Sequence, residues 1–172
     1  IQIYHKIYTM KKNVIEYKDI ENKIIYHDKF QKTKDISHHG ITRYEHLLRV
    51  AKKTYKVCRF LRLNYEEATR AALMHDLFDS ETKDMNAWDR LIKHPRIAAE
   101  NAKKYFGANE FEMSLIKTHM FPITLSPPIY LEGWILDIID DICAIEEKYI
   151  SLRKEIKVAM TFLFIMIINR VK

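Results

Sequence analysis

The chain has 172 residues, a length that suits one domain with a sizeable hydrophobic core. Its 3 glycines and 4 prolines are too few for the turns of a doubly wound or all-β fold, so the composition predicts an all-α fold. A formal net charge of +6 favours an anionic partner such as a phosphate ester or nucleotide. The lysines are scattered rather than clustered with aromatic residues, which disfavours a nucleic-acid surface.

Residues 1–36 are expected to form an N-terminal segment that packs on the core. Within it, a charged and loosely amphipathic pattern predicts a helix over Asn13–Phe30. The polar stretch Lys32–Gly40 is typical of a loop, and it ends in Ser37-His38-His39-Gly40.

Two helices with clear start signals follow. Thr42 and Glu45 have the spacing of a capping box, which predicts a helix start at Thr42 and places His46 in the first turn. Asn64 is a candidate cap for the next helix, whose small apolar residues continue to His75 and Asp76.

The middle of the chain predicts two further helices after a loop over Phe78–Asn86. Proline suits the first position of a helix, so one helix is expected to begin at Pro95, after His94, and to end at Gly107. Asn109 is expected to cap the next helix, which carries apolar residues at helical spacing as far as His119.

The last part predicts a long apolar helix over Ile129–Tyr149 and a final helix from a cap at Ser151 to Asn169. We therefore expect a main domain over residues 37–150, completed by a C-terminal helix over residues 151–172. The eleven-residue apolar run Val158–Ile168 is too short to cross a bilayer, which needs about 20 residues. It indicates a core helix or a contact in a homodimer.

Cys58 and Cys143 lie within apolar helical patterns, which predicts buried free thiols. No secretory signal pattern is seen, and the expected location is the cytoplasm.

Imidazole and carboxylate side chains recur at or near helix ends or within apolar helix faces. Such donors suit iron, manganese, zinc, cobalt or nickel if the helices bring them together in the interior of a bundle. The alternative is that each is a surface or capping residue, and Asp137 and Asp141 compete with Asp140. The candidate ligands are His46, His75, Asp76, His94, His119 and Asp140.

This order of residues resembles the HD-domain superfamily of metal-dependent phosphohydrolases. That pattern has an early histidine, a His-Asp pair and a late aspartate after an apolar residue, and here these match His46, His75-Asp76 and Ile139-Asp140. His94, before a proline, and His119 are similar to the extra histidines of the subgroup that holds two metal ions. The resemblance implies an HD-domain helical bundle.

The resemblance also implies roles for these residues. His46, His75, Asp76 and Asp140 would bind one metal, and Asp76 would bridge to a second metal held by His94 and His119. A carboxylate has two oxygens and can hold two cations close together, and such a pair lowers the pKa of a trapped water to give a hydroxide that attacks phosphorus. Catalysis would then depend on His75 and Asp76.

Arginine and lysine residues near these ligands in the sequence are candidates for contacts with a phosphate. The alternative for each is a solvent-exposed surface residue. A histidine of the loop before the first ligand is a further candidate. The candidate substrate-binding residues are Arg43, Lys93, Arg96, Lys117 and His39.

The substrate is less well defined by the resemblance. The chain lacks the Lys after His-Asp and the adjacent histidines of the cyclic-di-GMP phosphodiesterases. It is more similar to symmetrical diadenosine tetraphosphate hydrolases, and more still to uncharacterised bacterial HD proteins with a His-His-Gly stretch. The sequence thus predicts a phosphohydrolase acting on a nucleotide or related small molecule. The alternatives are a catalytically silent HD module that binds a nucleotide or signalling partner, and a purely structural bundle.

Overall fold

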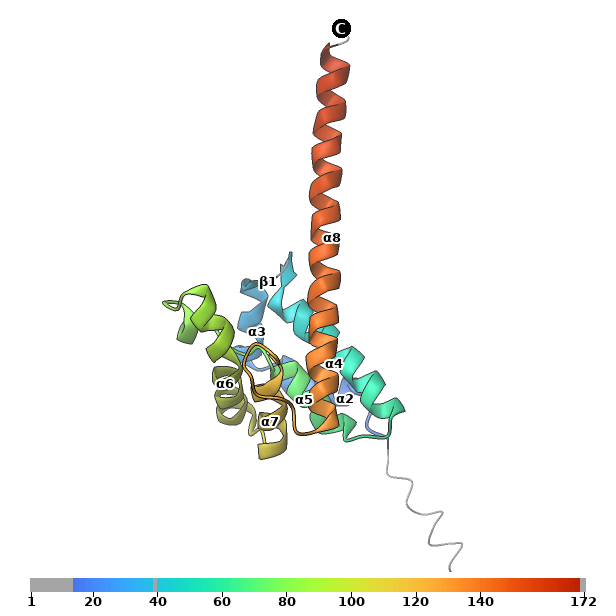
Figure 1. Cartoon of the computed structure of the whole chain (residues 1–172). Coiled ribbons are helices and arrows are strands. Elements are labelled where there is room, and N and C mark those ends of the chain that lie inside the picture. The colour runs from blue at the N-terminus through green and yellow to red at the C-terminus, as the bar shows by residue number, and fades with distance from the viewer. Residues whose placement is uncertain (1–13, 39, 171–172) are drawn as a thin grey trace, which may run out of the picture.

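The computed structural model describes residues 14–38 and 40–170, without the side chains of residues 80 and 163–170. Within these ranges the chain is a bundle of helices with one short β-hairpin, which confirms the all-α prediction (Figure 1). The elements are α2 (Tyr17–Ile25), α3 (Asp28–Gln31), η1 (Lys32–Asp35), β1 (Ser37–His38), β2 (Ile41–Thr42), α4 (Arg43–Phe60), α5 (Tyr65–Met74), η2 (Ser80–Thr82), α6 (Ala87–Phe106), α7 (Glu110–Thr118) and α8 (Leu131–Arg170).

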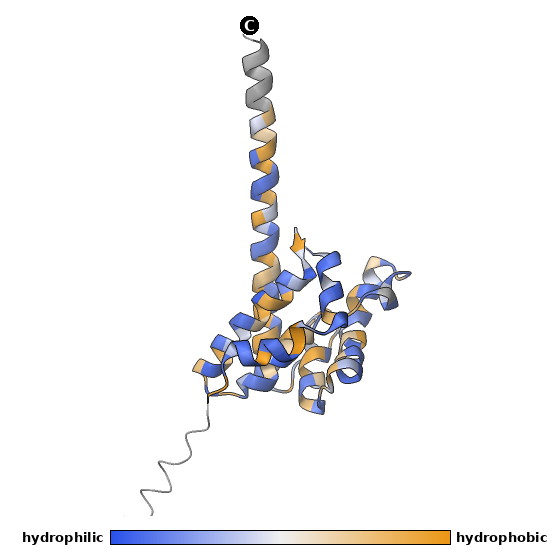
Figure 2. Ribbon diagram, turned by 180° about the vertical axis from the view of Figure 1, so that it is seen from behind, coloured by the Kyte–Doolittle hydropathy of each residue, from blue (hydrophilic) through white to orange (hydrophobic). Residues whose placement is uncertain are grey.

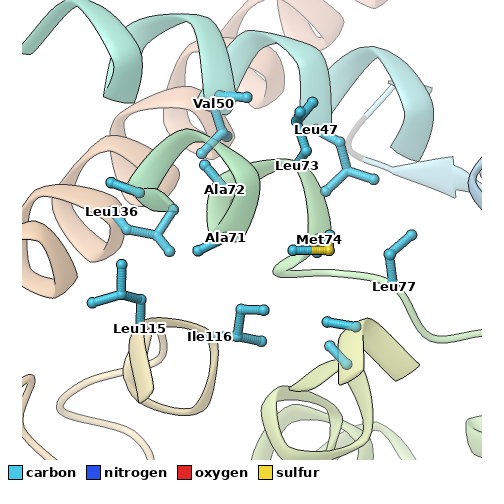
Figure 3. Packing of buried hydrophobic residues seen from close by; sticks show 14 of the residues in the cluster. Leu47, Val50, Ala71, Ala72, Leu73, Met74, Leu77, Leu115, Ile116 and Leu136 are labelled. Atoms are coloured by element: carbon cyan, nitrogen blue, oxygen red, sulfur yellow. The ribbon is translucent and has the colours of Figure 1, made fainter. Parts of the chain in front are cut away.

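Helix α5 lies at the centre of the bundle, in contact with α2, α4, α6, α7 and α8. Its alanines Ala68, Ala71 and Ala72 are fully buried, and their small side chains let the neighbouring helices approach closely. Figure 3 shows side chains of α4, α5, α7 and α8 meeting around this helix. The ligands predicted at the end of α5 are therefore held next to the buried core.

Several helix ends follow the local sequence signals. Thr42 forms a full capping box with Glu45 at the start of α4, and Asn109 forms one with Glu112 at the start of α7. Gly107 ends α6 in the left-handed conformation at φ 64°, as predicted from the preference of that conformation for glycine. Asn64 also occupies a cap position, but its side chain makes no capping hydrogen bond.

The N-terminal region differs from the prediction in two ways. The helix expected over Asn13–Phe30 is two helices, because the His27 side chain caps a new helix by accepting from the backbone N–H of Lys29. The stretch expected as a loop, Lys32–Gly40, contains η1 and β1, and β1 pairs antiparallel with β2, which follows the stretch. Beside this hairpin, Gly40 has φ 90°, and a Cβ there would lie 2.6 Å from Ser151 Oγ, so only glycine allows the hairpin to approach α8 so closely.

Helix α6 begins eight residues before the predicted start at Pro95. Asn86 caps it by accepting from the N–H of Asp89 at 2.8 Å, and Pro95 lies inside the helix. An internal proline removes one backbone hydrogen bond. The helix continues past it because its buried face, which includes Ala98, Ala99 and Ala102, packs in the core.

The cap predicted at Ser151 is wrong, because α8 is one continuous helix of 40 residues. No glycine or proline follows Gly133 to interrupt it, and a lone serine is tolerated within a helix. The C-terminal part of α8 extends beyond the other helices (Figure 1) and exposes apolar side chains such as Ile156 and Phe162. The dimer contact over Val158–Ile168 stays a prediction, since most of its side chains lie outside those described.

Figure 2 shows that apolar and polar residues alternate along most helices, as in amphipathic elements of a water-exposed bundle. Among the described residues, no helix combines the length and the apolar character needed to cross a membrane. Cys58 and Cys143 are buried free thiols, which confirms their prediction.

Candidate metal centre

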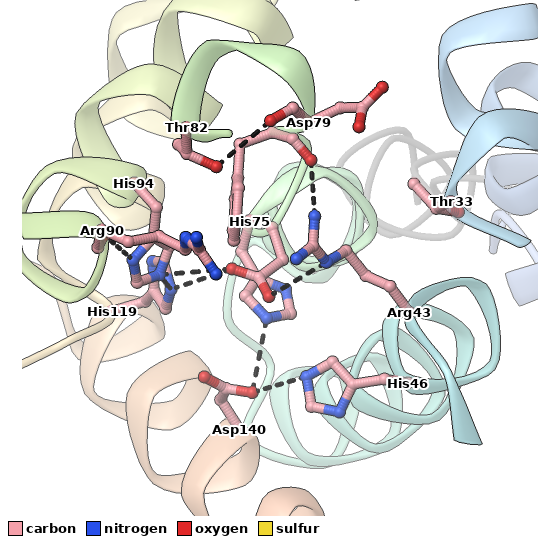
Figure 4. A network of polar contacts seen from close by, with 12 residues as sticks. Thr33, Arg43, His46, His75, Asp79, Thr82, Arg90, His94, His119 and Asp140 are labelled. Carbon is pink, nitrogen blue, oxygen red and sulfur yellow. Dashed lines mark hydrogen bonds and ion pairs between the residues drawn. The ribbon is translucent and has the colours of Figure 1, made fainter. Parts of the chain in front are cut away.

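The structure brings all six predicted ligands into one cluster at the centre of the bundle (Figure 4). One half joins His46 and His75 to Asp140, whose Oδ1 lies 2.8 Å from His46 Nε2 and 3.3 Å from His75 Nε2. The other half joins His94 and His119 to Asp76, whose Oδ1 lies 3.3 Å and 3.8 Å from the two Nε2 atoms. The halves are continuous, because ligand atoms of His75, Asp76 and His119 lie within 4.8 Å of one another.

Helix ends account for the position of several of these residues. His75 and His119 are the C-terminal caps of α5 and α7, and Asp76 follows His75 where the chain leaves α5. His46 lies in the first turn of α4, directly after the capping box that fixes the start of that helix. Residues far apart in the sequence therefore meet because the ends of packed helices meet.

Backbone carbonyls fix the protonation of three imidazoles. The Nδ1 atoms of His75, His94 and His119 lie 2.8, 3.0 and 2.7 Å from the carbonyl oxygens of Ala72, Arg90 and Ile116. A carbonyl only accepts, so each Nδ1 carries a proton and donates it, as is usual for histidines that bind metals. In the neutral rings, each Nε2 then presents its lone pair to the cluster.

This arrangement of lone pairs fits a cation. His94 Nε2 and His119 Nε2 face each other at 3.2 Å, and two lone pairs at that distance repel unless a cation or a proton lies with them. His75 Nε2 and Asp76 Oδ1 are buried without a hydrogen-bond partner among the described residues, and such groups are costly to bury unpaired. Four imidazoles and two carboxylates in one cluster are a donor set suited to divalent transition metals.

The histidines and aspartates of the cluster shift one another's pKa values. Burial lowers the pKa of His46, but hydrogen bonds to Asp140 and Glu147 outweigh it and raise the pKa to about 10. Burial lowers the pKa of His119 to about 4, and the nearby His75 and His94 add to that shift. Burial would raise the pKa of Asp140, yet the adjacent histidines hold it well below its usual value. The carboxylates thus stay ionised and ready to bind a cation.

Glu147 belongs to this centre but was not predicted. It is completely buried, and its Oε2 lies 3.0 Å from His46 Nδ1, on the side of the ring opposite Asp140. A carboxylate that accepts from the second nitrogen of a ligand histidine orients the ring and increases its basicity. The signal was present in the sequence, because residues seven apart, as Asp140 and Glu147 are, share one face of a helix.

Of the three neighbouring aspartates, Asp140 is the one that the structure brings to the imidazoles. Asp141 is exposed at the rim of the adjoining cavity. Asp137 is buried one turn earlier, and burial together with the charges of Asp141 and Asp140 raises its pKa to about 7.

The arginine and lysine residues predicted to bind substrate divide into two groups. Arg43 is buried beside the cluster, with its Nε 3.8 Å from Asp76 Oδ2 and its guanidinium 3.8 Å from the centre of the Phe78 ring. By contrast, Lys93, Arg96 and Lys117, which were also predicted to bind substrate, have exposed side chains. None of the three lines the cavities beside the cluster. Lys93 and Arg96 instead pair with acids one turn away on α6. His39 lies outside the described residues.

A cavity of about 440 Å³ opens from the cluster. Asp76, His94, His119 and Asp140 lie in its wall, and Arg43 and Arg90 add two positive charges. Arg90 was missed because the helix was expected to begin after it. Once α6 is known to begin at Ala87, Arg90 falls one turn before His94 on the same face.

The fold and the cluster define an all-helical protein with a buried histidine–aspartate centre that opens into a cavity bordered by two arginines. The sequence model of the HD domain matches residues 43–145, which is more than half of the chain and includes all six predicted ligands. The chain therefore belongs to the HD domain family, a family of metal-dependent phosphohydrolases. A search of curated proteins and a search of solved structures each found no significant match.

Proposed function

We propose that this protein is a metal-dependent phosphohydrolase that cleaves a phosphate ester or anhydride of a nucleotide or related small molecule. The observation that carries the proposal is a convergent donor set whose central atoms, His75 Nε2 and Asp76 Oδ1, are buried and make no hydrogen bond among the described residues. Each has only an ion-pair contact at 3.3 Å, to Asp140 and His94 respectively, as its shortest contact within the cluster. A structural bundle without a ligand has no use for such atoms, because each one destabilises the folded state.

Two divalent ions of iron, manganese, cobalt, nickel or zinc suit these donors. His46, His75 and Asp140 would hold one ion together with Asp76, and His94 and His119 would hold the other together with Asp76. Bound metal would supply Lewis acidity toward phosphoryl oxygens and lower the pKa of water near phosphorus.

The protein's own residues hold the substrate. Arg43 is fixed by donating from Nη1 to the carbonyl oxygen of Phe78 and by stacking on the Phe78 ring. Arg43 and Arg90 reach the cavity from two sides (Figure 4), where planar guanidinium groups match the oxygens of a phosphate. The apolar side chains of Leu91 and Met120 line the same cavity and reduce the access of bulk water to the phosphate.

The test combines metal analysis with a hydrolysis panel. Protein purified without chelators is expected to contain transition metal and to release phosphate or a nucleotide from some members of a panel of nucleotides and phosphate esters. Asp76→Asn is expected to lose metal and all hydrolysis, whereas Asp19→Asn, an exposed aspartate on α2, keeps both. Metal binding without hydrolysis across the panel would favour the silent HD module, and undiminished hydrolysis by Asp76→Asn would refute the proposal.

A further inference from the structure

A second cavity of about 510 Å³ adjoins the one at the metal centre. The two cavities share three wall residues, Arg43, Phe78 and Arg90, and therefore lie on either side of them. A molecule with one end at the cluster can extend past the two arginines into this space. The remaining wall residues are Ile36, Asp79, Thr82 and Lys83.

The second cavity carries more positive than negative charge. Its wall has Arg43, Lys83 and Arg90 against one carboxylate, that of Asp79. Within the part of the chain that the structure describes, Lys83 makes no ion pair, and Arg90 makes one side-chain hydrogen bond, from Nη2 to the carbonyl oxygen of Met85 at 3.2 Å.

Arg43 is the most costly of these cations. Its side chain is 8% exposed, and among the described residues its buried Nε has no hydrogen-bond partner; an Asp76 carboxylate oxygen lies 3.8 Å from it. Two guanidinium groups that repel across a shared wall are stabilised by an anion placed between them.

We propose that the second cavity is a subsite for a second phosphate group of the substrate, so that the protein acts on compounds with adjacent phosphates, the chemical class of nucleoside di- and triphosphates. This inference rests on the proposed function and specifies its substrate. The wall favours phosphate over a nucleobase, because the one aromatic ring, Phe78, is already covered by the Arg43 guanidinium. Arg43 and Arg90 would contact both phosphates, and Lys83 only the second.

The probe is methylenediphosphonate, which has two phosphonate groups on one carbon and resists hydrolysis, compared with methylphosphonate. Calorimetric titration of the metal-loaded protein, with metal content measured before and after, gives both dissociation constants. The wild type is expected to bind the diphosphonate about tenfold more tightly. Lys83→Ala should weaken the binding of the diphosphonate but not of methylphosphonate, by about threefold, because it removes one exposed charge. Arg90→Ala should weaken the binding of both ligands.

Lys104→Ala is the matched control, because it removes one exposed charge from α6 about 21 Å along the helix from Arg90. Equal affinity of the wild type for the two phosphonates, or a Lys83→Ala protein that behaves like Lys104→Ala, would overturn the subsite. Because binding is measured without turnover, the two proposals fail separately. Hydrolysis without the preference for diphosphonate refutes the subsite alone, and the preference without any hydrolysis refutes the phosphohydrolase alone.

Discussion

Glu147 provides the sharpest test of the centre, because it contacts a ligand and not the substrate cavity. Its side chain is fully buried and accepts from His46 Nδ1 at 3.0 Å. Glu147→Gln keeps the shape and leaves an amide oxygen to accept that proton, but it removes the charge. Hydrogen bonds to charged groups contribute about 1.5–3 kcal/mol, roughly twice as much as neutral ones, so the substitution should weaken metal binding by about 1–1.5 kcal/mol.

That free energy corresponds to about a tenfold loss of metal affinity, at the lower end of the effect of residues that orient metal ligands. The assay is metal titration against a competing chelator. A second readout is the pKa of His46 in chelated protein, followed by NMR, which should fall from its raised value because Glu147 is one of the two carboxylates that raise it.

Glu146→Gln is the matched control on the next residue of α8. Glu146 is 44% exposed and pairs with Arg49 at 2.9 Å and Lys53 at 2.8 Å rather than with His46. It is expected to leave metal affinity and the pKa of His46 close to those of the wild type. Unchanged affinity in Glu147→Gln, or an equal loss in Glu146→Gln, would refute the assignment of Glu147 to the centre.

Three further predictions concern stability and pH. Ile24→Ala should lower the unfolding free energy measured in urea by about 2–5 kcal/mol, because Ile24 is fully buried; Tyr26→Ala, with Tyr26 72% exposed, should change it by less than about 0.5 kcal/mol. Equal effects would show that α2 does not pack on the core. Metal at 100 times its dissociation constant should stabilise the protein by about 2.7 kcal/mol, and an unchanged melting temperature would contradict the metal centre. The pKa of His46, 6.5 in the unfolded chain and about 10 in the folded metal-free protein, gives stability that is complete below pH 6.5 and is lost as the pH rises toward 10. Metal must displace the same proton, so metal affinity should rise over that range, and a pH-independent titration would be the contrary result.

Local signals predicted the parts of the fold that depend on a few adjacent residues. The capping boxes at Thr42 and Asn109 and the glycine at 107 each act through contacts within one turn, and the structure has all three. The errors arose where packing overrode a local preference. Pro95 lies inside α6, and Ser151 lies inside α8. The β-hairpin was missed because strands of two residues are too short for any periodic pattern.

The candidate site was predictable to the extent that it depends on residue type and order. An early histidine, a His-Asp pair at a helix end, single histidines in later helices and a late aspartate led to the six residues that the structure places together. Residues that assist them were harder to find. Glu147 is not one of the residues that the family pattern names, and Arg90 was hidden by the wrong start of α6. The predicted cations at Lys93, Arg96 and Lys117 were chosen by closeness in the sequence, which does not specify which way a helical side chain points.

The buried charges explain why the fold and the proposed function depend on each other. Asp76 and Asp140 are held ionised by the histidines around them, and the metal-free protein balances them with a proton on His46 whose raised pKa depends on Asp140 and Glu147. One half of the cluster depends on α8 and the other on α6 and α7, with α5 between them. A cation bound at the centre would therefore link these helices and relieve the repulsion of the facing lone pairs of His94 and His119. The residues that would bind metal for hydrolysis are thus also those that would link the two sides of the bundle through it.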